Sequence, residues 1–323
     1  MGELRAPFPY FGGKSKACEL VWQRFGEVKN YVEPFCGSAA MLLGAPDGSR
    51  IETINDADGF IANFWRAVTA DPAAVAHYAD YPVSEIDFHA RQAWLVNRAE
   101  RLRYLLEDVD YYDPKIAGWW CWGANLQIGA GFCDGKGPHV GNGVEIVDTR
   151  KLPHLGDKGK GINRELPHLS NKGQGIRHVF ILDWFETLSD RLRHVRICHG
   201  DWSRVVKDSV TVRHGLTAVF LDPPYTKGSM DYAAGGVGTD LPMRVQAWCA
   251  ENGGNPKLRI AICGHAGEHD ALIEHGWTVG RWKARKGYAR TEEARQNTAD
   301  ETIWFSPHCI GGDVNLFSGV ANG

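Results

Sequence analysis

The sequence predicts an α/β fold built on a Rossmann-like mixed sheet with helices on both faces. An apolar run at 219–221 that stops at a pair of prolines is typical of a buried parallel strand. Strand, sharp turn and helix are expected to follow one another at 31–43 and again at 50–69. Segments 277–282 and 301–305 predict a terminal antiparallel pair, which would make the sheet mixed.

The most informative motif is Asp222-Pro223-Pro224-Tyr225, which directly follows the apolar run. Proline cannot continue a strand ladder, and a residue that precedes proline is held extended. The strand must therefore stop at the edge of the sheet where open α/β folds bind ligands. The Asp222 carboxylate and the Pro223 carbonyl can accept hydrogen bonds from an amino group, and Tyr225 can stack on a flat ring. The motif suits the exocyclic amine of a nucleobase; the alternative is an ordinary proline turn.

Length and composition limit the class of protein. The 323 residues, 43 % of them apolar, fit one large α/β domain or a domain with an insertion. The net charge of −3 excludes a global polycation, so contact with nucleic acid must come from local patches. The eight cysteines form no CxxC pair and the 13 histidines lack metal-ligand spacing, so we assign no metal. We expect a cytoplasmic protein with reduced thiols and no membrane partner.

A glycine pair marks the first candidate ligand-binding segment. Gly12 and Gly13 precede Lys14, and a helix is expected from Ser15, as N-cap, to about residue 25. A turn of this kind can hold an anionic group on its free amides. The spacing of a Walker loop is missing, and an ordinary loop is the alternative.

Residues 31–43 predict a short strand, a sharp turn and a helix. Gly37 and Ser38 would allow a ligand to approach the start of this helix closely. The next strand, 50–56, ends in Asp56, which lies 19 residues beyond Gly37. An acid at about this spacing meets ribose hydroxyls in nucleotide-binding folds. A helix cap is the alternative role for Asp56, because a helix at 57–69 follows.

A helical segment at 72–110 and 117–128 then interrupts the alternation. Residues 129–178 are rich in glycine and basic side chains, and the Leu-Pro-His-Leu of 152–155 returns after 14 residues, at 166–169. Such a stretch is typical of a loop that contacts DNA phosphates, or else of a solvated, flexible insertion. Its basic residues between 150 and 177 are Arg150, Lys151, Lys158, Lys160, Arg164, Lys172 and Arg177.

The strand–helix alternation resumes after residue 178. We expect helices at 184–192, 241–250 and 266–275, strands at 195–202 and 258–263, and a glycine-rich loop at 226–240. A second basic patch is expected between the last two strands, at 281–290.

In this order, the motifs resemble those of the Dam-like (D12 class, alpha-group) DNA adenine-N6 methyltransferases. The resemblance rests on 7–14, 32–38, Asn55-Asp56, Gly200-Asp201-Trp202 and Asp222-Pro223-Pro224-Tyr225. Three features differ, and the first is that 301–306 only loosely matches the family's last strand. Asn125, at the position of the family's middle motif, is followed by Leu126 instead of an Asn-Gly pair, and the insertion does not look like the typical recognition domain.

The resemblance implies a class I S-adenosylmethionine-dependent methyltransferase domain formed by 1–71 and 179–323, with 72–178 as an inserted target-recognition region. Asp56 would bind the ribose of the cofactor, and Asp201 its adenine end. The implied cofactor-binding residues are Tyr10, Gly12, Gly13, Lys14, Glu33, Pro34, Phe35, Cys36, Gly37, Ser38, Asp56, Asp201, Trp202 and Asp222.

The implied reaction methylates the N6 amine of an adenine flipped out of double-stranded DNA. Its catalytic residues would be Asp222, Pro223, Pro224 and Tyr225. The DNA-binding residues would be the seven basic residues of 150–177 together with Asn125, Tyr225 and Lys227. We expect a monomer or weak dimer, with a cognate restriction endonuclease as a candidate partner.

Three alternatives stay open at this stage. The same geometry would serve a cytosine-N4 or RNA amino-methyltransferase. The fold would also suit a catalytically inactive DNA-binding module. A small-molecule α/β enzyme is the third alternative, and the long basic insertion argues against it.

Overall fold

A computed structural model describes residues 4–9, 17–127, 132–133, 139–141, 146–148, 178–224, 240–281 and 301–311. The strands are β1 (Asn30–Glu33), β2 (Ile51–Asp56), β3 (His139–Gly141), β4 (Ile146–Asp148), β5 (Val195–His199), β6 (Thr217–Leu221), β7 (Leu258–His265), β8 (Thr278–Arg281) and β9 (Glu301–Phe305). The α-helices are α1 (Cys18–Phe25), α2 (Ala40–Leu43), α3 (Gly59–Ala70), α4 (Pro72–Ala79), α5 (Glu85–Val96), α6 (Ala99–Leu105), α7 (Pro114–Leu126), α8 (His178–Leu192) and α9 (Leu241–Asn252). Short 3₁₀ turns are η1 (Trp202–Arg204), η2 (Val212–His214) and η4 (Asp270–His275).

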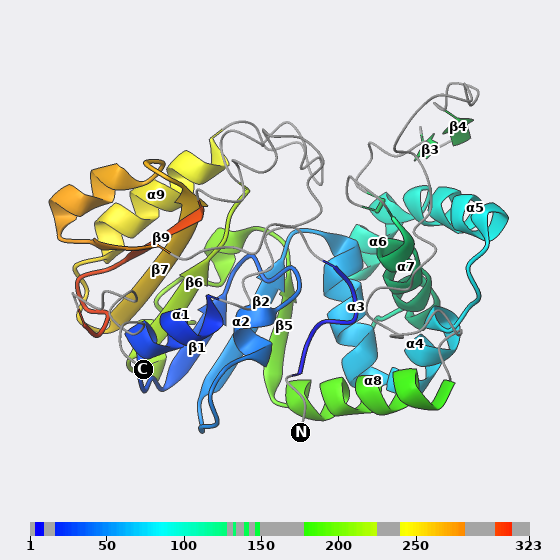
Figure 1. Ribbon diagram of the computed structural model, residues 1–323, viewed down its shortest axis with the longest axis horizontal. Helices are drawn as coiled ribbons and strands as arrows, with labels where there is room; N and C mark the ends of the chain where they lie inside the picture. Colours follow the sequence, from blue (N-terminus) through cyan, green and yellow to red (C-terminus); the bar gives the residue numbers. More distant parts are fainter. Residues whose placement is uncertain are drawn as a thin grey trace, which may run out of the picture.

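A seven-stranded sheet forms the centre of the molecule, in the order β5-β2-β1-β6-β7-β9-β8 (Figure 1). The pairs from β5 to β7 are parallel, whereas β9 runs antiparallel to both β7 and β8. The chain starts in the middle of the sheet, with β1, and moves outward in both directions, which creates a switch point between β1 and β6. This mixed sheet confirms the predicted class I methyltransferase fold.

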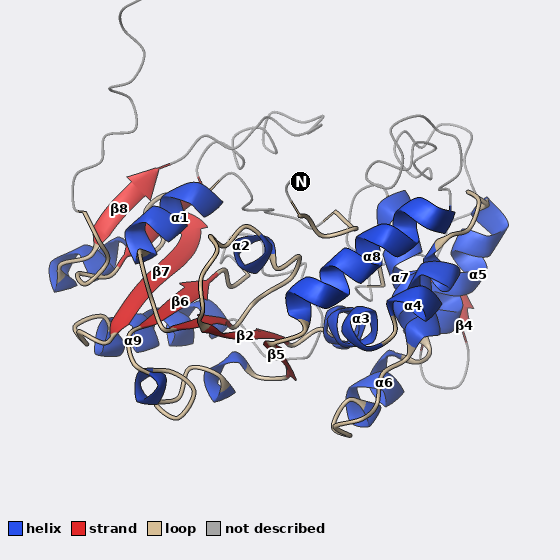
Figure 2. Ribbon diagram, turned by 90° about the horizontal axis from the view of Figure 1, so that it is seen from below, coloured by secondary structure: helices blue, strands red, loops and turns tan. Residues whose placement is uncertain are grey.

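Two hydrophobic cores, one on each face, hold the sheet. Successive side chains of a strand point to opposite faces, so a strand in the middle of the sheet can contribute to both cores. On β6, Ala218 and Phe220 join the core that includes α1 and α2, and Val219 and Leu221 join the core that includes α9. Figure 2 shows α1 and α2 on one side of the strands and α9 on the other. The predicted placement of helices on both faces is therefore confirmed.

A separate group of helices, α4 to α7, lies beside the sheet, with α3 and α8 between the two (Figure 1). Helix α7 packs against α3 and α4, and α8 packs against the same two helices. The antiparallel β3–β4 pair belongs to the inserted part of the chain. The proposed boundaries of the insertion stay a prediction. Within the described residues, no helix is both long and apolar enough to cross a membrane.

Several predicted boundaries need correction. Helix α1 begins at Cys18 with Ala17 at its N-cap, and Ser15 lies outside the described residues. The predicted helix 266–275 is a turn followed by the 3₁₀ segment η4. The predicted strand 195–202 ends at His199, because Gly200 has a φ of 128° and turns the chain away from the sheet.

Candidate active site

The candidate site lies at the carboxyl edge of the parallel strands, where β1, β2, β5 and β6 end next to one another. Strand β1 lies between β2 and β6, and β5 follows β2. The register aligns these ends, since Asp56 at the end of β2 pairs with His199 at the end of β5. The four segments that follow these strands carry four of the motifs predicted from the sequence, and the fold brings them to one edge.

The turn after β1, residues 34–39, has a strained backbone that is held by backbone hydrogen bonds. The N–H of Cys36 donates to the carbonyl of Asn55 at 2.9 Å, and the N–H of Ala39 donates to the carbonyl of Cys36 at 2.6 Å. Gly37 and Ala39 both have left-handed backbones, with φ of 45° and 49°. An alanine is uncommon there because its Cβ crowds the following carbonyl, so its surroundings must hold it.

Asp56 fixes this turn from the neighbouring strand. Its Oδ2 accepts the backbone N–H of Gly37 at 2.9 Å, and its Oδ1 accepts the N–H of Asp58 at 2.9 Å. Burial, followed by the nearby Asp58 carboxylate, raises the pKa of Asp56 to about 7. The helix cap of α3 is Asp58, which accepts from Phe60, so Asp56 does not cap that helix. Asp56 instead presents its carboxylate beside the glycine turn, as a ribose-binding acid would.

Asn55 joins three of the segments that meet at the edge. Its Nδ2 donates to the carbonyls of Pro34, at 2.9 Å, and Gly200, at 3.0 Å. The backbone N–H of Gly200 in turn donates to the carbonyl of Asp56 at 3.0 Å. The sequence predicted a role for Asp56 but missed this role of Asn55. Its position at the end of a strand, one residue before Asp56, was the available signal.

Glu33, the last residue of β1, is almost fully buried, with 2 % of its surface exposed. Its Oε2 accepts the hydroxyl of Tyr31 at 2.9 Å and the N–H of Leu42 at 3.2 Å. Burial raises the pKa of Glu33 to about 8, and the nearby Asp222 carboxylate adds to this effect. Glu33 is therefore mostly protonated at pH 7. It supports the segment that follows β1 as a hydrogen-bonded carboxyl group.

An aromatic pair borders the site on the side of β5. The rings of Phe35 and Trp202 stack with centroids 6.0 Å apart and 29° between their planes. Trp248 of α9 meets Trp202 edge-on at 6.2 Å. Trp202 is buried whereas Phe35 is partly exposed, so this pair offers an apolar wall at the edge of the sheet. A wall of this kind suits a flat ring such as adenine.

Asp201 directly precedes Trp202 in the chain and is exposed. Its Oδ1 accepts the N–H of Ser203 at 2.9 Å and the Ser203 hydroxyl at 2.5 Å. Burial opposes ionisation, but these hydrogen bonds and the cations of Arg244 and Arg204 keep the pKa of Asp201 below its ordinary value. Asp201 is thus a fixed carboxylate beside the aromatic wall, where an acceptor for an amino group would be needed.

The predicted catalytic motif follows β6 directly, as the sequence indicated. Strand β6 ends at Leu221; Asp222 and Pro224 are partly exposed, and Pro223 is buried. The Asp222 carboxylate lies near enough to Glu33 to influence its pKa. Tyr225 lies outside the described residues.

The first described segment of the chain packs against α3 and α7 through Pro7 and Phe8. Phe8 is buried and meets Phe64 and Trp120 at ring distances of 5.1 and 4.8 Å. Asn125 of α7 donates through Nδ2 to the carbonyl of Pro7 at 2.7 Å and is 1 % exposed. This burial favours a structural role for Asn125, which anchors the N-terminal segment, over the predicted contact with DNA.

Many predicted residues lie outside the described part of the chain. They are Tyr10, Gly12, Gly13, Lys14, Arg150, Lys151, Lys158, Lys160, Arg164, Lys172, Arg177, Tyr225 and Lys227. The second basic patch, 281–290, also lies outside it except for the backbone of Arg281. Among the described residues, no group of three or more His, Cys, Asp or Glu side chains could hold a metal ion.

Comparison with known proteins gives one family. Residues 10–110 match the family described as D12 class N6 adenine-specific DNA methyltransferase. No curated protein matches the chain. The matched residues include the glycine turn, Asp56 and the first helices of the inserted segment, and they support DNA adenine methylation as the reaction class. This family match and the order of the sheet confirm the predicted resemblance of the chain to the D12 class N6 adenine-specific DNA methyltransferases.

Proposed function

We propose that the protein is a site-specific DNA methyltransferase that transfers a methyl group from S-adenosylmethionine to the N6 amine of adenine in duplex DNA. The observation that carries this proposal is the position of Asp222-Pro223-Pro224. The motif stands at the end of β6, next to the strained turn that follows β1. A class I amino-methyltransferase needs two features at one switch point: a group that accepts hydrogen bonds from the target amine, and a turn that binds the cofactor.

The residues at this edge fit the proposed cofactor in the chemistry of their side chains. Asp56 presents a carboxylate beside the glycine turn, and carboxylate oxygens are suitable acceptors for the two hydroxyls of a ribose. Phe35 offers an apolar face for adenine, and Asp201 an acceptor for the adenine amine. S-adenosylmethionine would supply an electrophilic methyl group to the amine.

Asp222 and the Pro223 carbonyl would accept the two N–H groups of the target amine. These hydrogen bonds orient the lone pair of the nitrogen and stabilise the positive charge that develops on it. The amine would release one proton through Asp222 to solvent as its bond to the methyl carbon forms, and the electron pair of the broken carbon–sulfur bond would stay with the thioether that S-adenosylmethionine becomes. Tyr225 would stack on the base, which must leave the duplex to reach this edge.

Contact with DNA is proposed for the basic residues of 150–177 and for Lys227, because phosphate contacts account for much of the affinity of DNA-binding proteins. Asn125 is proposed to act only through the segment that it anchors. A cognate restriction endonuclease, a monomeric or weakly dimeric state and a cytoplasmic location stay predictions of the sequence.

The test uses methyl-labelled S-adenosylmethionine and unmethylated duplex DNA, with the labelled nucleoside identified after digestion. Asp222→Asn should lower turnover by more than about 100-fold, because one acceptor for the reacting amine becomes an amide. Cofactor binding should fall much less. Asp208→Asn, at an exposed aspartate in the segment before β6, is the matched control and should leave turnover unchanged.

Each outcome of this test has a distinct meaning. Label on N6-methyladenine that disappears in Asp222→Asn supports the proposal. Label on cytosine N4 or on RNA would show that the substrate is cytosine or RNA and not adenine in DNA. Cofactor binding without label on any nucleic acid would favour an inactive DNA-binding module. Equal loss of turnover and cofactor binding would refute the catalytic role of Asp222.

A further inference from the structure

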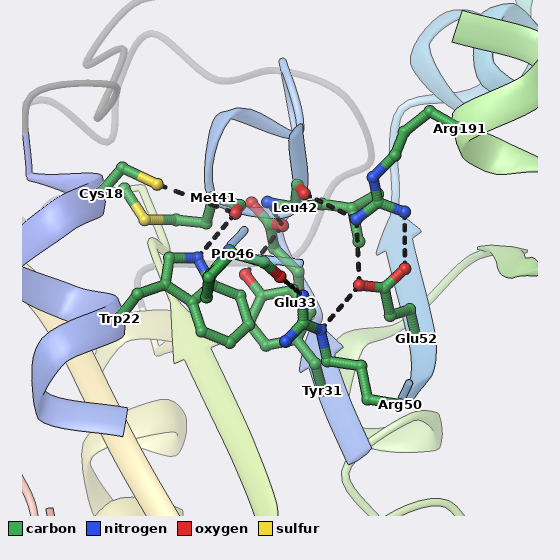
Figure 3. A network of polar contacts seen from close by, with 10 residues as sticks. All are labelled: Cys18, Trp22, Tyr31, Glu33, Met41, Leu42, Pro46, Arg50, Glu52 and Arg191. Carbon is green, nitrogen blue, oxygen red and sulfur yellow. Dashed lines mark hydrogen bonds and ion pairs between the residues drawn. The ribbon is translucent and has the colours of Figure 1, made fainter. Parts of the chain in front are cut away.

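Helix α2 follows the 34–39 turn, which is the proposed cofactor-binding turn, and has only four residues. A helix of one turn is unstable on its own, because nucleation costs more than its few hydrogen bonds return. The chain enters it through Ala39, whose backbone is left-handed. Both features require contacts from elsewhere in the protein to hold α2, and Figure 3 shows these contacts.

The backbone groups at the end of α2 are bound by side chains from three different elements. Trp22 of α1 donates its indole N–H to the carbonyl of Met41 at 2.9 Å. Arg191 of α8 donates through Nη2 to the carbonyl of Leu42 at 2.8 Å. The N–H of Leu42 donates to Glu33 of β1 at 3.2 Å. The last carbonyls of a helix have no partner within it, and Trp22 and Arg191 donate to two of them. The Leu42 carbonyl also accepts the backbone N–H of Ala45 at 3.2 Å.

Arg191 is itself fixed by Glu52 of β2. Its Nη1 lies 2.6 Å from Oε2 of Glu52, and its Nη2 lies 2.9 Å from Oε1 (Figure 3). The side chain of Glu52 is 10 % exposed, so this bidentate pair is largely shielded from water. Arg50 also donates to Oε1 of Glu52, at 2.9 Å. Glu52 would therefore keep one cationic partner if Arg191 were lost.

Helix α8 links the contacts of Arg191 with Leu42 and Glu52 to the inserted part of the chain. It is the first described helix after β4, and it packs against α3 and against α4 of the helical group. Arg191 lies in its last turn. The guanidinium therefore connects the helical group to the carbonyl end of α2, immediately after the strained turn.

We propose that Arg191 is a positioning residue for cofactor binding. Through Leu42 and Glu52 it holds α2, and with it the 34–39 turn, in the shape that receives the cofactor. This inference rests on the proposed function. It also links cofactor affinity to the position of α8, and such coupling is reciprocal.

The decisive variant is Arg191→Met, which keeps an apolar stem of similar length and removes all three hydrogen bonds. Arg193→Met is the matched control, because Arg193 lies just beyond the same helix and its ion pair with Asp190 is exposed. Arg191→Lys is the conservative variant. It keeps the charge but cannot span Leu42 and Glu52 with a fork, so it should restore only part of the effect.

We expect Arg191→Met to raise the Kd for S-adenosylmethionine about tenfold and to change kcat at saturating cofactor less than about twofold, since it alters binding and not the reacting atoms. Hydrogen exchange of the amides at 36–43, measured without cofactor, should become faster. Arg193→Met should change neither the Kd nor the rate of hydrogen exchange at 36–43.

The exchange measurement separates failure of this inference from failure of the proposed function. Unchanged exchange at 36–43 in Arg191→Met would overturn the positioning role whether or not the protein binds the cofactor. Faster exchange with an unchanged Kd would overturn the link to the cofactor. A wild-type protein that does not bind S-adenosylmethionine would refute the proposed function and, with it, the cofactor part of this inference.

Discussion

Replacing Glu33 by glutamine tests how the buried carboxyl group at the end of β1 is held. Burial and the Asp222 carboxylate raise the pKa of Glu33 from 4.5 to about 8, against the lowering effect of its hydrogen bonds from Tyr31 and Leu42. Between these pKa values the native protein keeps a proton that the unfolded chain has released. The stability that Glu33 contributes is therefore complete below pH 4.5 and is lost as the pH rises to 8.

The difference between the two pKa values corresponds to a loss of on the order of 4 kcal/mol across this window. Glutamine keeps an oxygen that can accept from Tyr31 and Leu42, but it carries no titratable proton. We expect Glu33→Gln to match the wild type within about 1 kcal/mol near pH 5, because both side chains are then neutral. Near pH 9 the variant should be the more stable protein, by roughly 3–4 kcal/mol.

The assay is urea denaturation of wild type, Glu33→Gln and the exposed control Glu27→Gln at several pH values from 5 to 9, analysed by linear extrapolation. Glu27→Gln should follow the wild-type curve. If the free energies of unfolding of wild type and Glu33→Gln stay parallel over this range, the carboxyl group does not hold a proton in the native state. The explanation of its burial would then be wrong.

Two further predictions concern the cofactor turn and the helical group. Asp56→Asn can accept only one of the two N–H groups that now bind its carboxylate, so the Kd for S-adenosylmethionine should rise roughly 10–100-fold by calorimetry; an unchanged Kd would contradict this. Gly118→Ala would place a Cβ 2.4 Å from Cβ of Tyr78 and 2.7 Å from the carbonyl of Val75, so thermal unfolding should show a loss of at least about 2 kcal/mol. Gly254→Ala, with no atom within 4 Å, is its control, and equal effects of the two would refute the packing argument.

The features that the sequence predicted well are those that depend on neighbouring residues. The proline pair after 219–221 ends β6 whatever surrounds it, and the structure ends that strand at Leu221. The strands expected at the start of 31–43 and at 50–56 became β1 and β2, and each begins within one residue of its expected start. Because carboxyl ends of parallel strands meet at one edge, the position of Asp56 and Asp222 also followed from the sequence.

The features that the sequence did not predict depend on distant contacts. Nothing local to Asn125 indicates that its side chain would be buried against Pro7, 118 residues away. The 3₁₀ segment η4 also has a distant contact that the local sequence does not indicate, because Asp270 at its start accepts the indole N–H of Trp304 in β9 at 3.0 Å. The left-handed backbone of Ala39 is also unexpected from sequence, because the residue expected in that conformation is glycine.

A single backbone position, Leu42, receives the contacts from both sides of the candidate site. Its N–H donates to Glu33 of β1, and its carbonyl accepts from Arg191 of α8. The insertion lies between β2 and β5, and the chain returns from it to the sheet through α8. That point of insertion places the last turn of α8 directly against α2. A movement of the helical group would act on the Leu42 carbonyl, and ionisation of Glu33 would act on its N–H. Under the proposed function, the one-turn helix after the 34–39 turn is thus where movement of the helical group and pH would both change cofactor affinity.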